Sequence, residues 1–216
     1  MIARVGSAAK QQPLLYADGA VVINRARCFA AGPQPAHVIE FNDLFRTERD
    51  SPPDFASLSA ALFLTFCYNS AILKPLLDHG VKLIIAANFE APLGEPEAPK
   101  LARPTVRVIT SSVPRIKSTF HPKLFLLRFP AFLRVVVGSG NLFSEDWTAF
   151  GNCFYVRDFP LLPQALPAPR SQFHAYLGEY LREVFGGDTS ALLASLGIEL
   201  LRYDMDAHCP LLVGSL

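Results

Sequence analysis

The chain has 216 residues, of which 50% are hydrophobic and 18% are charged, and its formal net charge is +1. These values allow one large domain or two small ones with a sizeable buried core, and they exclude a protein that grips nucleic acid through bulk positive charge. No apolar run reaches the ~20 residues of a membrane span, and residues 1–10 lack the pattern of a secretory signal.

The first part of the chain divides into a lead-in and the start of a domain. Residues 1–36 mix Ala, Gly, Gln and Pro without a clear period, and we expect them to form a partly ordered lead-in. A short apolar piece within it, from Ala20 to Ile23, is consistent with an edge strand. Residues 37–216 are expected to form the folded domain.

A strand-helix-strand order opens the domain. The apolar segment from Phe55 to Tyr68 predicts a buried strand at its end, and Val81 to Ala87 predicts a second one. Between them, Asn69 or Ser70 caps a helix that runs to about His79. This order predicts a parallel α/β unit.

The rest of the domain contains further strands and two helices. Ser171 predicts the N-cap of a helix from about Gln172 to Phe185, and a shorter helix to Leu196 follows. Phe159 to Pro169 is rich in proline and predicts a loop. Strands are predicted at Val106–Thr110, Lys123–Phe129, Leu133–Val137, Cys153–Val156 and Leu211–Val213. The predicted fold class is α/β, a mixed central β-sheet flanked by helices on both faces.

Two neighbouring strands bring together residues that suit phosphate chemistry. His121 and Lys123 are two residues apart on a strand, so their side chains point to the same face. A hairpin turn then leads to the segment from Gly138 to Asn141. If Ala131 lies in a two-residue tip, His121 lies opposite Gly140, and a tip one residue longer places it opposite Asn141.

Each of these residues has a chemical role that its side chain allows. The neutral form of His121 can attack phosphorus near pH 7, and Lys123 supplies a fixed positive charge for the phosphate oxygens. Ser139 and Asn141 add neutral hydrogen-bond donors where charge develops. Because these groups neutralise the phosphate, we expect no metal and no cofactor.

Lys117 and Ser118, just before the histidine, are further candidates for contact with phosphate or DNA. Lys117 and Arg115 would then line a DNA groove. The alternative is a solvated loop.

His-x-Lys, followed 20 positions after His121 by Gly-Ser-x-Asn, resembles the motif of the phospholipase D superfamily. The ending at Asn141, with Asp146-Trp147 close behind it, is similar to the first motif of tyrosyl-DNA phosphodiesterase. Weaker similarity extends from about Val38 to the end of the chain. The resemblance implies the N-terminal half of a pseudo-two-fold enzyme, in which His121 is the nucleophile and Lys123 and Asn141 bind phosphate.

The same resemblance implies an activity. The family removes adducts, such as a topoisomerase tyrosine, from a DNA 3′-phosphate through a phosphohistidine intermediate. DNA carrying a 3′-phosphodiester adduct would be the partner, without a membrane. The implied location is nuclear, or otherwise cytoplasmic.

Two departures from the family pattern stand out. No second His-x-Lys occurs, because His37, His79, His174 and His208 each lack a lysine two residues on. The second histidine must therefore come from a missing C-terminal half or from a second copy of the chain in a homodimer. The family also tends to have a DNA-stacking aromatic residue before the nucleophile, a place that Phe120 or Lys117 would have to take.

Two alternatives follow from the single motif. One is another nuclease or lipase of the phospholipase D type that acts as a dimer. The site residues cannot distinguish it, because they contact the phosphodiester and not the groups attached to it. The other is a catalytically dead truncated domain that binds DNA or a protein. The cysteines, which are widely spaced at Cys28, Cys67, Cys153 and Cys209, favour free thiols in a reducing compartment over disulfides or zinc.

Overall fold

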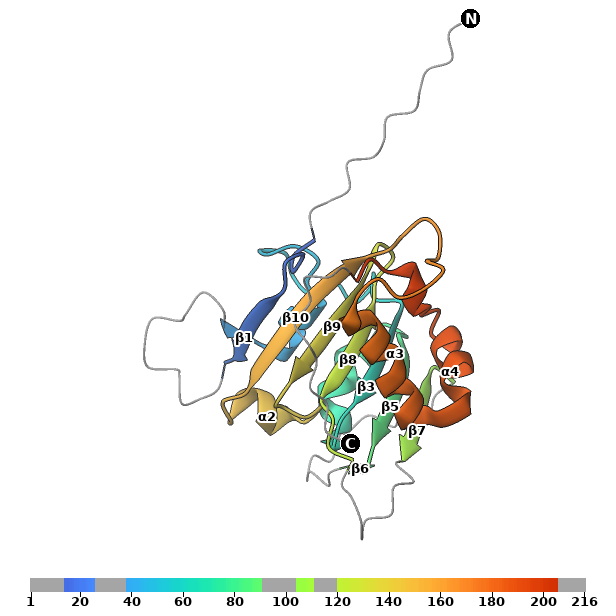
Figure 1. The fold of residues 1–216 in the computed structure, drawn as a ribbon. Coiled ribbons are helices and arrows are strands. Elements are labelled where there is room, and N and C mark those ends of the chain that lie inside the picture. Colours follow the sequence, from blue (N-terminus) through green and yellow to red (C-terminus); the bar gives the residue numbers. More distant parts are fainter. Residues whose placement is uncertain (1–13, 26–37, 91–103, 111–119, 206–216) are drawn as a thin grey trace, which may run out of the picture.

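The structure is a computed structural model that describes residues 14–25, 38–90, 104–110 and 120–205. Within these residues, a mixed sheet of eight strands forms the centre, with helices on both faces (Figure 1). In spatial order the strands are β2 (Val38–Ile39), β1 (Ala20–Asn24), β10 (Cys153–Pro160), β9 (Phe132–Gly138), β8 (Leu124–Arg128), β3 (Ala60–Leu64), β5 (Lys82–Ala87) and β7 (Val106–Thr110). A separate small sheet pairs β4 (Cys67–Tyr68) with β6 (Phe89–Glu90). The predicted fold class is confirmed.

The directions of the strands determine which strands finish and which begin on the side of the sheet that carries the candidate site. β3, β5 and β7 run parallel, whereas β8, β9 and β10 alternate in direction next to β3. Leu64 of β3 pairs with Leu124 of β8. Leu124 pairs with Val137 of β9, and Val137 pairs with Tyr155 of β10. β3 and β9 therefore end at the edge where β8 and β10 begin.

Different helices cover the two faces of the sheet. On one face lie α3 (Gln172–Phe185), η4 (Gly186–Asp188), α4 (Thr189–Ser195) and η5 (Leu200–Arg202), and on the other lie η2 (Phe41–Phe45), η3 (Ser70–Leu73), α1 (Lys74–Asp78) and α2 (Ser144–Thr148). Side chains alternate between two cores. Phe63 and Phe125 point towards η2, while Leu62 and Leu126 point towards α3. Burial on both faces explains why these strands are apolar almost throughout.

Two predicted helix caps are confirmed. The side-chain oxygen of Asn69 accepts hydrogen bonds from the N–H groups of Ala71 and Ile72 at the start of η3, at 2.8 and 3.2 Å. Oγ of Ser171 accepts a hydrogen bond of 3.1 Å from the N–H of His174 in α3. Both satisfy donors that the first turn of a helix leaves unpaired. In the described ranges, no helix is both long enough and apolar enough to cross a membrane.

Two strands differ from the predictions. β1 is present but does not form the edge of the sheet, because β2 pairs on its outer side. β10 continues past the predicted end at Val156 to Pro160, so the predicted loop is shorter. The extension is stabilised by Phe159, whose ring packs on Phe173 of α3. The strand predicted at Leu211–Val213 lies outside the described residues.

A buried ion pair ties the strands to the N-terminal segment and η2. Nε and Nη2 of Arg134 donate to the two carboxylate oxygens of Asp158 at 2.6 and 2.7 Å, and both side chains are fully buried. Nη1 of Arg134 donates to the carbonyl oxygens of Leu44 and Arg46, each at 2.7 Å. The N–H of Tyr16 donates to Asp158 at 3.1 Å. This network satisfies the buried charges.

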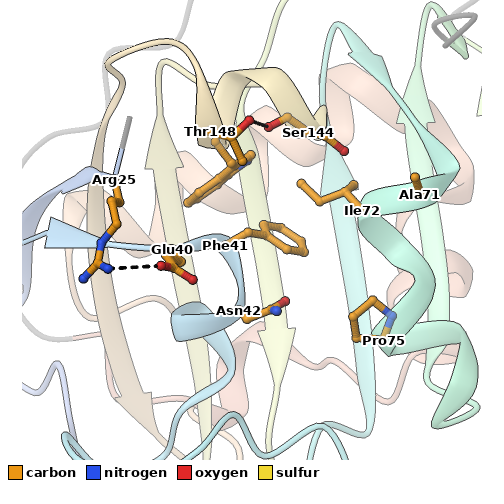
Figure 2. Close-up of a pocket in the computed structure, with 10 residues that line it drawn as sticks. Arg25, Glu40, Phe41, Asn42, Ala71, Ile72, Pro75, Ser144 and Thr148 are labelled. Carbon is orange, nitrogen blue, oxygen red and sulfur yellow. Dashed lines mark hydrogen bonds and ion pairs between the residues drawn. The ribbon is translucent and has the colours of Figure 1, made fainter. Parts of the chain in front are cut away.

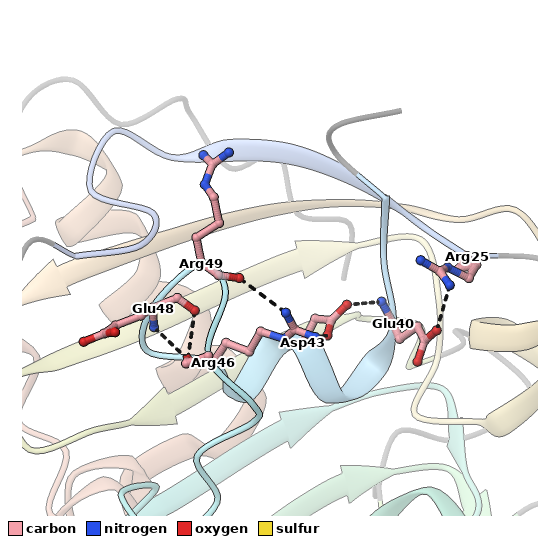
Figure 3. Close-up of polar contacts among 7 residues, drawn as sticks. Arg25, Glu40, Asp43, Arg46, Glu48 and Arg49 are labelled. Carbon is pink, nitrogen blue, oxygen red and sulfur yellow. Dashed lines mark hydrogen bonds and ion pairs between the residues drawn. The ribbon is translucent and has the colours of Figure 1, made fainter. Parts of the chain in front are cut away.

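The outer side of η2 carries polar contacts near the protein surface (Figure 3). Asp43 accepts a hydrogen bond from the N–H of Glu40 and pairs with Arg46, at 2.9 and 2.8 Å. Nη1 of Arg46 donates to the carbonyl oxygen of Arg49 at 3.3 Å, and Arg25 pairs with Glu40 at 3.5 Å. Exposed pairs of this kind contribute little to stability.

Candidate active site

The candidate site lies at the sheet edge where β3 and β9 end and β8 and β10 begin. Lys123 directly precedes β8, and its carbonyl oxygen accepts a hydrogen bond of 3.1 Å from the N–H of Gly138, the last residue of β9. At the far end of the hairpin the N–H of Phe129 donates to the carbonyl oxygen of Phe132 at 3.0 Å. The tip therefore has two residues, and the shorter of the two predicted turns is confirmed.

His121 and Lys123 lie in direct contact, although both precede β8 instead of lying on a strand as predicted. Nζ of Lys123 is 2.8 Å from Nδ1 and 2.9 Å from Nε2 of His121, and 3.2 Å from its carbonyl oxygen. Lys123 is 8% exposed, whereas His121 is open to solvent. The ring of Phe66 packs against the imidazole with 5.0 Å between centroids. The pair thus combines a buried ammonium group, an accessible imidazole and an apolar wall.

The surroundings of His121 favour the neutral imidazole over the imidazolium. The pKa of His121 is lowered, first because partial burial disfavours the imidazolium and second because the ammonium of Lys123 repels another positive charge. Burial also lowers the pKa of Lys123, and the nearby Asp146 and Cys67 act in the opposite direction. Neutral His121 can therefore accept a hydrogen bond from Lys123. This is the protonation state that a nucleophilic histidine requires.

Asn141 is held by the first turn of α2. Oδ2 of Asp146 accepts hydrogen bonds from the backbone N–H and from the side-chain amide of Asn141, at 2.6 and 2.8 Å. Nε1 of Trp147 donates to the carbonyl oxygen of Asn141 at 3.0 Å. Trp147 is buried and stacks on Phe154, with 4.3 Å between ring centroids. The position of Asn141 therefore depends on packing inside the core.

Thr65 joins the end of β3 to this segment. Its hydroxyl group donates to the carbonyl oxygen of Cys67 at 2.8 Å and accepts from the N–H of Leu142 at 3.1 Å. The side-chain oxygen of Asn141 lies 3.4 Å from the same hydroxyl group. Because the hydroxyl hydrogen is shared with the closer Cys67 carbonyl, the contact to Asn141 is the weaker one.

Ser139 is occupied by contacts within the protein. Its hydroxyl group donates to the side chain of Asn152 at 2.8 Å and accepts from the N–H of Cys153 at 3.2 Å. A role for this hydroxyl in phosphate binding would require the bond to Asn152 to be exchanged. Close packing explains the glycine on either side, because a side chain at Gly138 or Gly140 would meet the ring of Phe154.

The residue before the nucleophile candidate is anchored to the end of β5. The side-chain amide of Asn88, which directly follows β5, donates to the carbonyl oxygen of Phe120. This bond fixes the backbone that enters His121. Lys117 and Ser118, the other predicted contact residues, lie outside the described residues.

The structure adds residues to which the sequence argument gave no role. Asp146 belongs to the resemblance pattern, but its contact with Asn141 depends on how the loop before α2 folds. Asn88 lies more than thirty positions before the residue that it holds. Phe66 lies between β3 and β4, and its contact with His121 does not follow from its place in the apolar segment from Phe55 to Tyr68. No spacing rule in the sequence marks any of these contacts.

A cavity of about 390 Å³ lies on the η2 side of the sheet (Figure 2). It is lined by Arg25, Glu40, Phe41, Asn42, Ala71, Ile72, Pro75, Ser144, Trp147 and Thr148. Trp147 lines this cavity and also holds Asn141, but His121 and Lys123 are not part of the lining. The cavity is therefore separate from the candidate site. In the part of the chain that the structure describes, no group of three or more His, Cys, Asp or Glu side chains is placed to hold a metal ion.

Comparison with known proteins gives a consistent result. A family model described as tyrosyl-DNA phosphodiesterase matches residues 25–216. Yeast tyrosyl-DNA phosphodiesterase has a similar structure, with a TM-score of 0.60 and 18% identity over 86% of this chain and 42% of that chain. A histidine-to-asparagine mutant of the yeast protein gives a TM-score of 0.61 at 18% identity, over 87% of this chain and 42% of that chain. No curated protein sequence matches.

These comparisons bear on the fold and on the family. At 18% identity, the likeness to the yeast structures shows the fold alone. The chain spans 42% of the length of the yeast protein. The resemblance predicted from the His-x-Lys and Gly-Ser-x-Asn segments is confirmed.

Proposed function

Because the chain belongs to the tyrosyl-DNA phosphodiesterase family, we propose that it forms one half of a phosphodiesterase site that removes tyrosyl or other adducts from a DNA 3′-phosphate. One observation carries the proposal. The accessible imidazole of His121, whose pKa is lowered, lies beside the ammonium of Lys123, and Asn141 is held at the same sheet edge. This set supplies a nucleophile, a positive charge and a neutral donor for one phosphate.

The first step would be attack of a ring nitrogen of His121 on phosphorus. The N–P bond forms as the bond from phosphorus to the adduct oxygen breaks, and the DNA 3′-phosphate becomes attached to His121. Lys123 and Asn141 would hold the non-bridging oxygens, where they stabilise the charge of the transition state. The adduct leaves with the electron pair of the broken bond and needs a proton from a general acid. Water then hydrolyses the phosphohistidine.

In this scheme the contact between Lys123 and His121 would have to break when the phosphodiester binds. The ammonium contacts both ring nitrogens, so it can donate to whichever of them carries the lone pair that attack requires. A phosphate anion is a stronger acceptor than a neutral imidazole. Binding of the phosphodiester would therefore draw Lys123 to the phosphate oxygens and free His121. In this scheme the positive charge of Lys123 and the donor of Asn141 neutralise the phosphate, which is the task that a metal ion would otherwise perform.

The general acid is expected to be a second histidine. The chain has no second His-x-Lys, so this histidine would come from a second half of the protein or from a second copy of this chain across a two-fold axis. Domain residues 37–216 would supply the half-site, and the family resemblance favours a nuclear location, or otherwise a cytoplasmic one. Lys117, Ser118 and Ser139 are proposed to help hold the DNA strand.

A second function of another class is favoured by the missing second motif. A chain without a general acid could bind a DNA 3′ end or a protein without catalysis. A nuclease or lipase of the same superfamily, acting as a dimer, would share the chemistry of His121. The three differ in what they cleave: DNA adducts, other phosphodiesters, or nothing.

The test is cleavage, in the presence of EDTA, of an oligonucleotide that carries a 3′-(4-nitrophenyl phosphate), because nitrophenolate leaves without a proton from a general acid. We expect release of nitrophenolate by the chain and loss of release in His121→Ala. His79→Ala is the matched control, because His79 precedes β5 and so lies at the sheet edge opposite the site. Salt-dependent binding of the oligonucleotide without cleavage would instead support the binding module.

A further inference from the structure

Asp146 makes a paired contact with Asn141 that the proposed chemistry does not yet use. One carboxylate oxygen accepts both the backbone N–H and the side-chain amide of Asn141, at 2.6 and 2.8 Å. The two donors belong to one residue, so the carboxylate fixes both the backbone and the side-chain torsions of Asn141. Hydrogen bonds to a charged acceptor are about twice as strong as those between neutral groups.

The contact decides which end of the amide is presented to a ligand. With Nδ2 bonded to Asp146, one of its two hydrogens is used and the second remains for a phosphate oxygen. Without Asp146 the amide could turn over, since the hydroxyl of Thr65 holds the other end only through a 3.4 Å contact. A turned amide would present its oxygen to the phosphate. Two acceptors would then face each other, and the interaction would be repulsive.

Asp146 is itself fixed by neighbouring elements. Its carbonyl oxygen accepts hydrogen bonds from the side-chain amides of Asn24 and Asn152, each at 2.8 Å. The next residue, Trp147, is buried and holds the carbonyl oxygen of Asn141. The carboxylate is therefore carried on a rigid support that includes β1 and β10.

We propose that Asp146 is the positioning residue of the site, which holds the amide of Asn141 with its N–H towards the phosphate and supplies a negative charge near Lys123. The inference rests on the proposed function, because it concerns how the same phosphate is bound. It assigns no contact between Asp146 and the substrate. Its action passes through Asn141 and Lys123.

The charge of Asp146 adds a second effect that a purely structural residue would not have. The imidazole of His121 contacts Lys123, and the thiol of Cys67 and the carboxylate of Asp146 act on it electrostatically. Burial lowers the pKa of Lys123, and Asp146 raises it again. Removing the charge of Asp146 would lower the pKa of Lys123 further. The lysine would then lose its proton at a lower pH.

The test uses the chain with thymidine 3′-(4-nitrophenyl phosphate). Nitrophenolate leaves without a proton, so the half-site can perform the first step without a general acid. The single variants are Asp146→Ala, Asp146→Asn and Asn141→Ala, and the double variant combines both alanines. The first readout is the rate of nitrophenolate release across a pH series. The second is the near-ultraviolet circular dichroism spectrum, which shows whether each variant is folded.

We expect Asp146→Ala and Asn141→Ala each to slow release by roughly 100-fold, the usual effect of losing one transition-state donor. The double variant should be no slower than either single one, because both remove the same interaction. Asp146→Asn keeps an acceptor for Asn141 but not the charge. It should recover part of the rate near neutral pH, and its rate should fall at a lower alkaline pH than that of the parent.

The outcomes separate the inference from the function on which it rests. Release by the parent that survives Asp146→Ala but not Asn141→Ala overturns the positioning role and leaves the proposed function standing. The positioning role is also overturned if the double variant is slowed by the product of the two single effects. It is overturned as well if a folded Asp146→Asn loses its rate at the same alkaline pH as the parent. No release by the parent, together with no binding of inorganic phosphate, overturns the proposed function and the inference with it.

Discussion

The ammonium group of Lys123 contacts both ring nitrogens of His121, at 2.8 and 2.9 Å. This relationship links the two residues electrostatically as well as geometrically. A protonated lysine can donate to the ring only while the ring is neutral, so the pKa of each group depends on the charge of the other. The acid–base behaviour of the pair is therefore a direct probe of the site.

His121 should titrate below the ordinary range of a histidine. Burial and the charge of Lys123 both disfavour its protonated form in the folded chain, so its pKa is lowered. The unfolded chain then binds a proton that the folded chain does not. Stability from this group is present above the unfolded pKa and is lost as the pH falls through the lowered pKa. Any activity that uses the neutral ring falls over the same range.

Replacing the lysine should move this titration upwards. In Lys123→Met the repulsion is removed, so the pKa of His121 rises towards its ordinary value. The ring proton shift in an NMR pH series measures the change. Lys74→Met is the control, because exposed Lys74 pairs with Asp78 and lies in α1. An unchanged His121 titration in Lys123→Met would contradict the contact.

Gly138 should not tolerate a side chain. A Cβ atom there would meet the ring of Phe154 and lie 2.8 Å from the carbonyl oxygen of Cys153. We expect Gly138→Ala to lower the free energy of unfolding by about 1–3 kcal/mol through overpacking. It should also displace the segment that carries Asn141.

Gly178 offers the matched control within α3. A Cβ atom there would lie 3.9 Å from a methyl group of Leu200, which is an ordinary contact. Gly178→Ala should therefore raise the free energy of unfolding by up to about 1 kcal/mol, through better helix propensity. Urea denaturation measures both variants. Equal effects of the two substitutions would count against the packing described at the site.

The buried ion pair between Arg134 and Asp158 should be sensitive to removal of one partner. Arg134→Met leaves a carboxylate in the core without its main partner, and the expected loss in unfolding free energy is about 3–5 kcal/mol. The double variant Arg134→Met/Asp158→Leu should be less destabilised than Arg134→Met alone. The exposed pair of Lys74 and Asp78 serves as comparison, with an expected loss below about 1 kcal/mol. A double variant that is the least stable of the set would refute this account.

Asn88 should affect rate more than stability. Asn88→Ala removes one hydrogen bond to the carbonyl oxygen of Phe120, which contributes about 1 kcal/mol to stability. The backbone entering His121 would lose its anchor, and a shift of about 1 Å at a nucleophile can slow a reaction by about 100-fold. Exposed Asn42 in η2 is the control position. If Asn88→Ala reacts as fast as Asn42→Ala, the anchor has no functional role.

Much of the fold could be predicted because short sequence patterns, such as apolar runs and helix-capping residues, determine its strands and helices. The strands that cross the centre of the sheet are apolar almost throughout, and the caps at Asn69 and Ser171 have side chains that satisfy helix N–H groups. The length of the turn between β8 and β9 determines how these strands pair, as far as Leu124 and Val137 next to Lys123. These signals act over a few residues, so a single sequence reveals them.

The remaining contacts depend on distances that a sequence does not contain. The bond from Asp146 to Asn141 requires the loop before α2 to turn back on itself. The contact of Asn88 with Phe120 joins the ends of two elements that meet only in the folded sheet. The position of β1 inside the sheet depends on β2, a strand of two residues that has too little pattern to predict.

The central claim is that His121 forms a covalent bond to phosphorus. The direct measurement is the mass of the chain after reaction with an oligonucleotide that carries a 3′-(4-nitrophenyl phosphate), in EDTA and with an alkaline quench. The account predicts a burst of about one equivalent of nitrophenolate and an oligonucleotide phosphate attached to the peptide that contains His121. Both should be absent from His121→Ala and present in His79→Ala. Nitrophenolate release without an adduct on His121, or an adduct that persists in His121→Ala, would contradict the account.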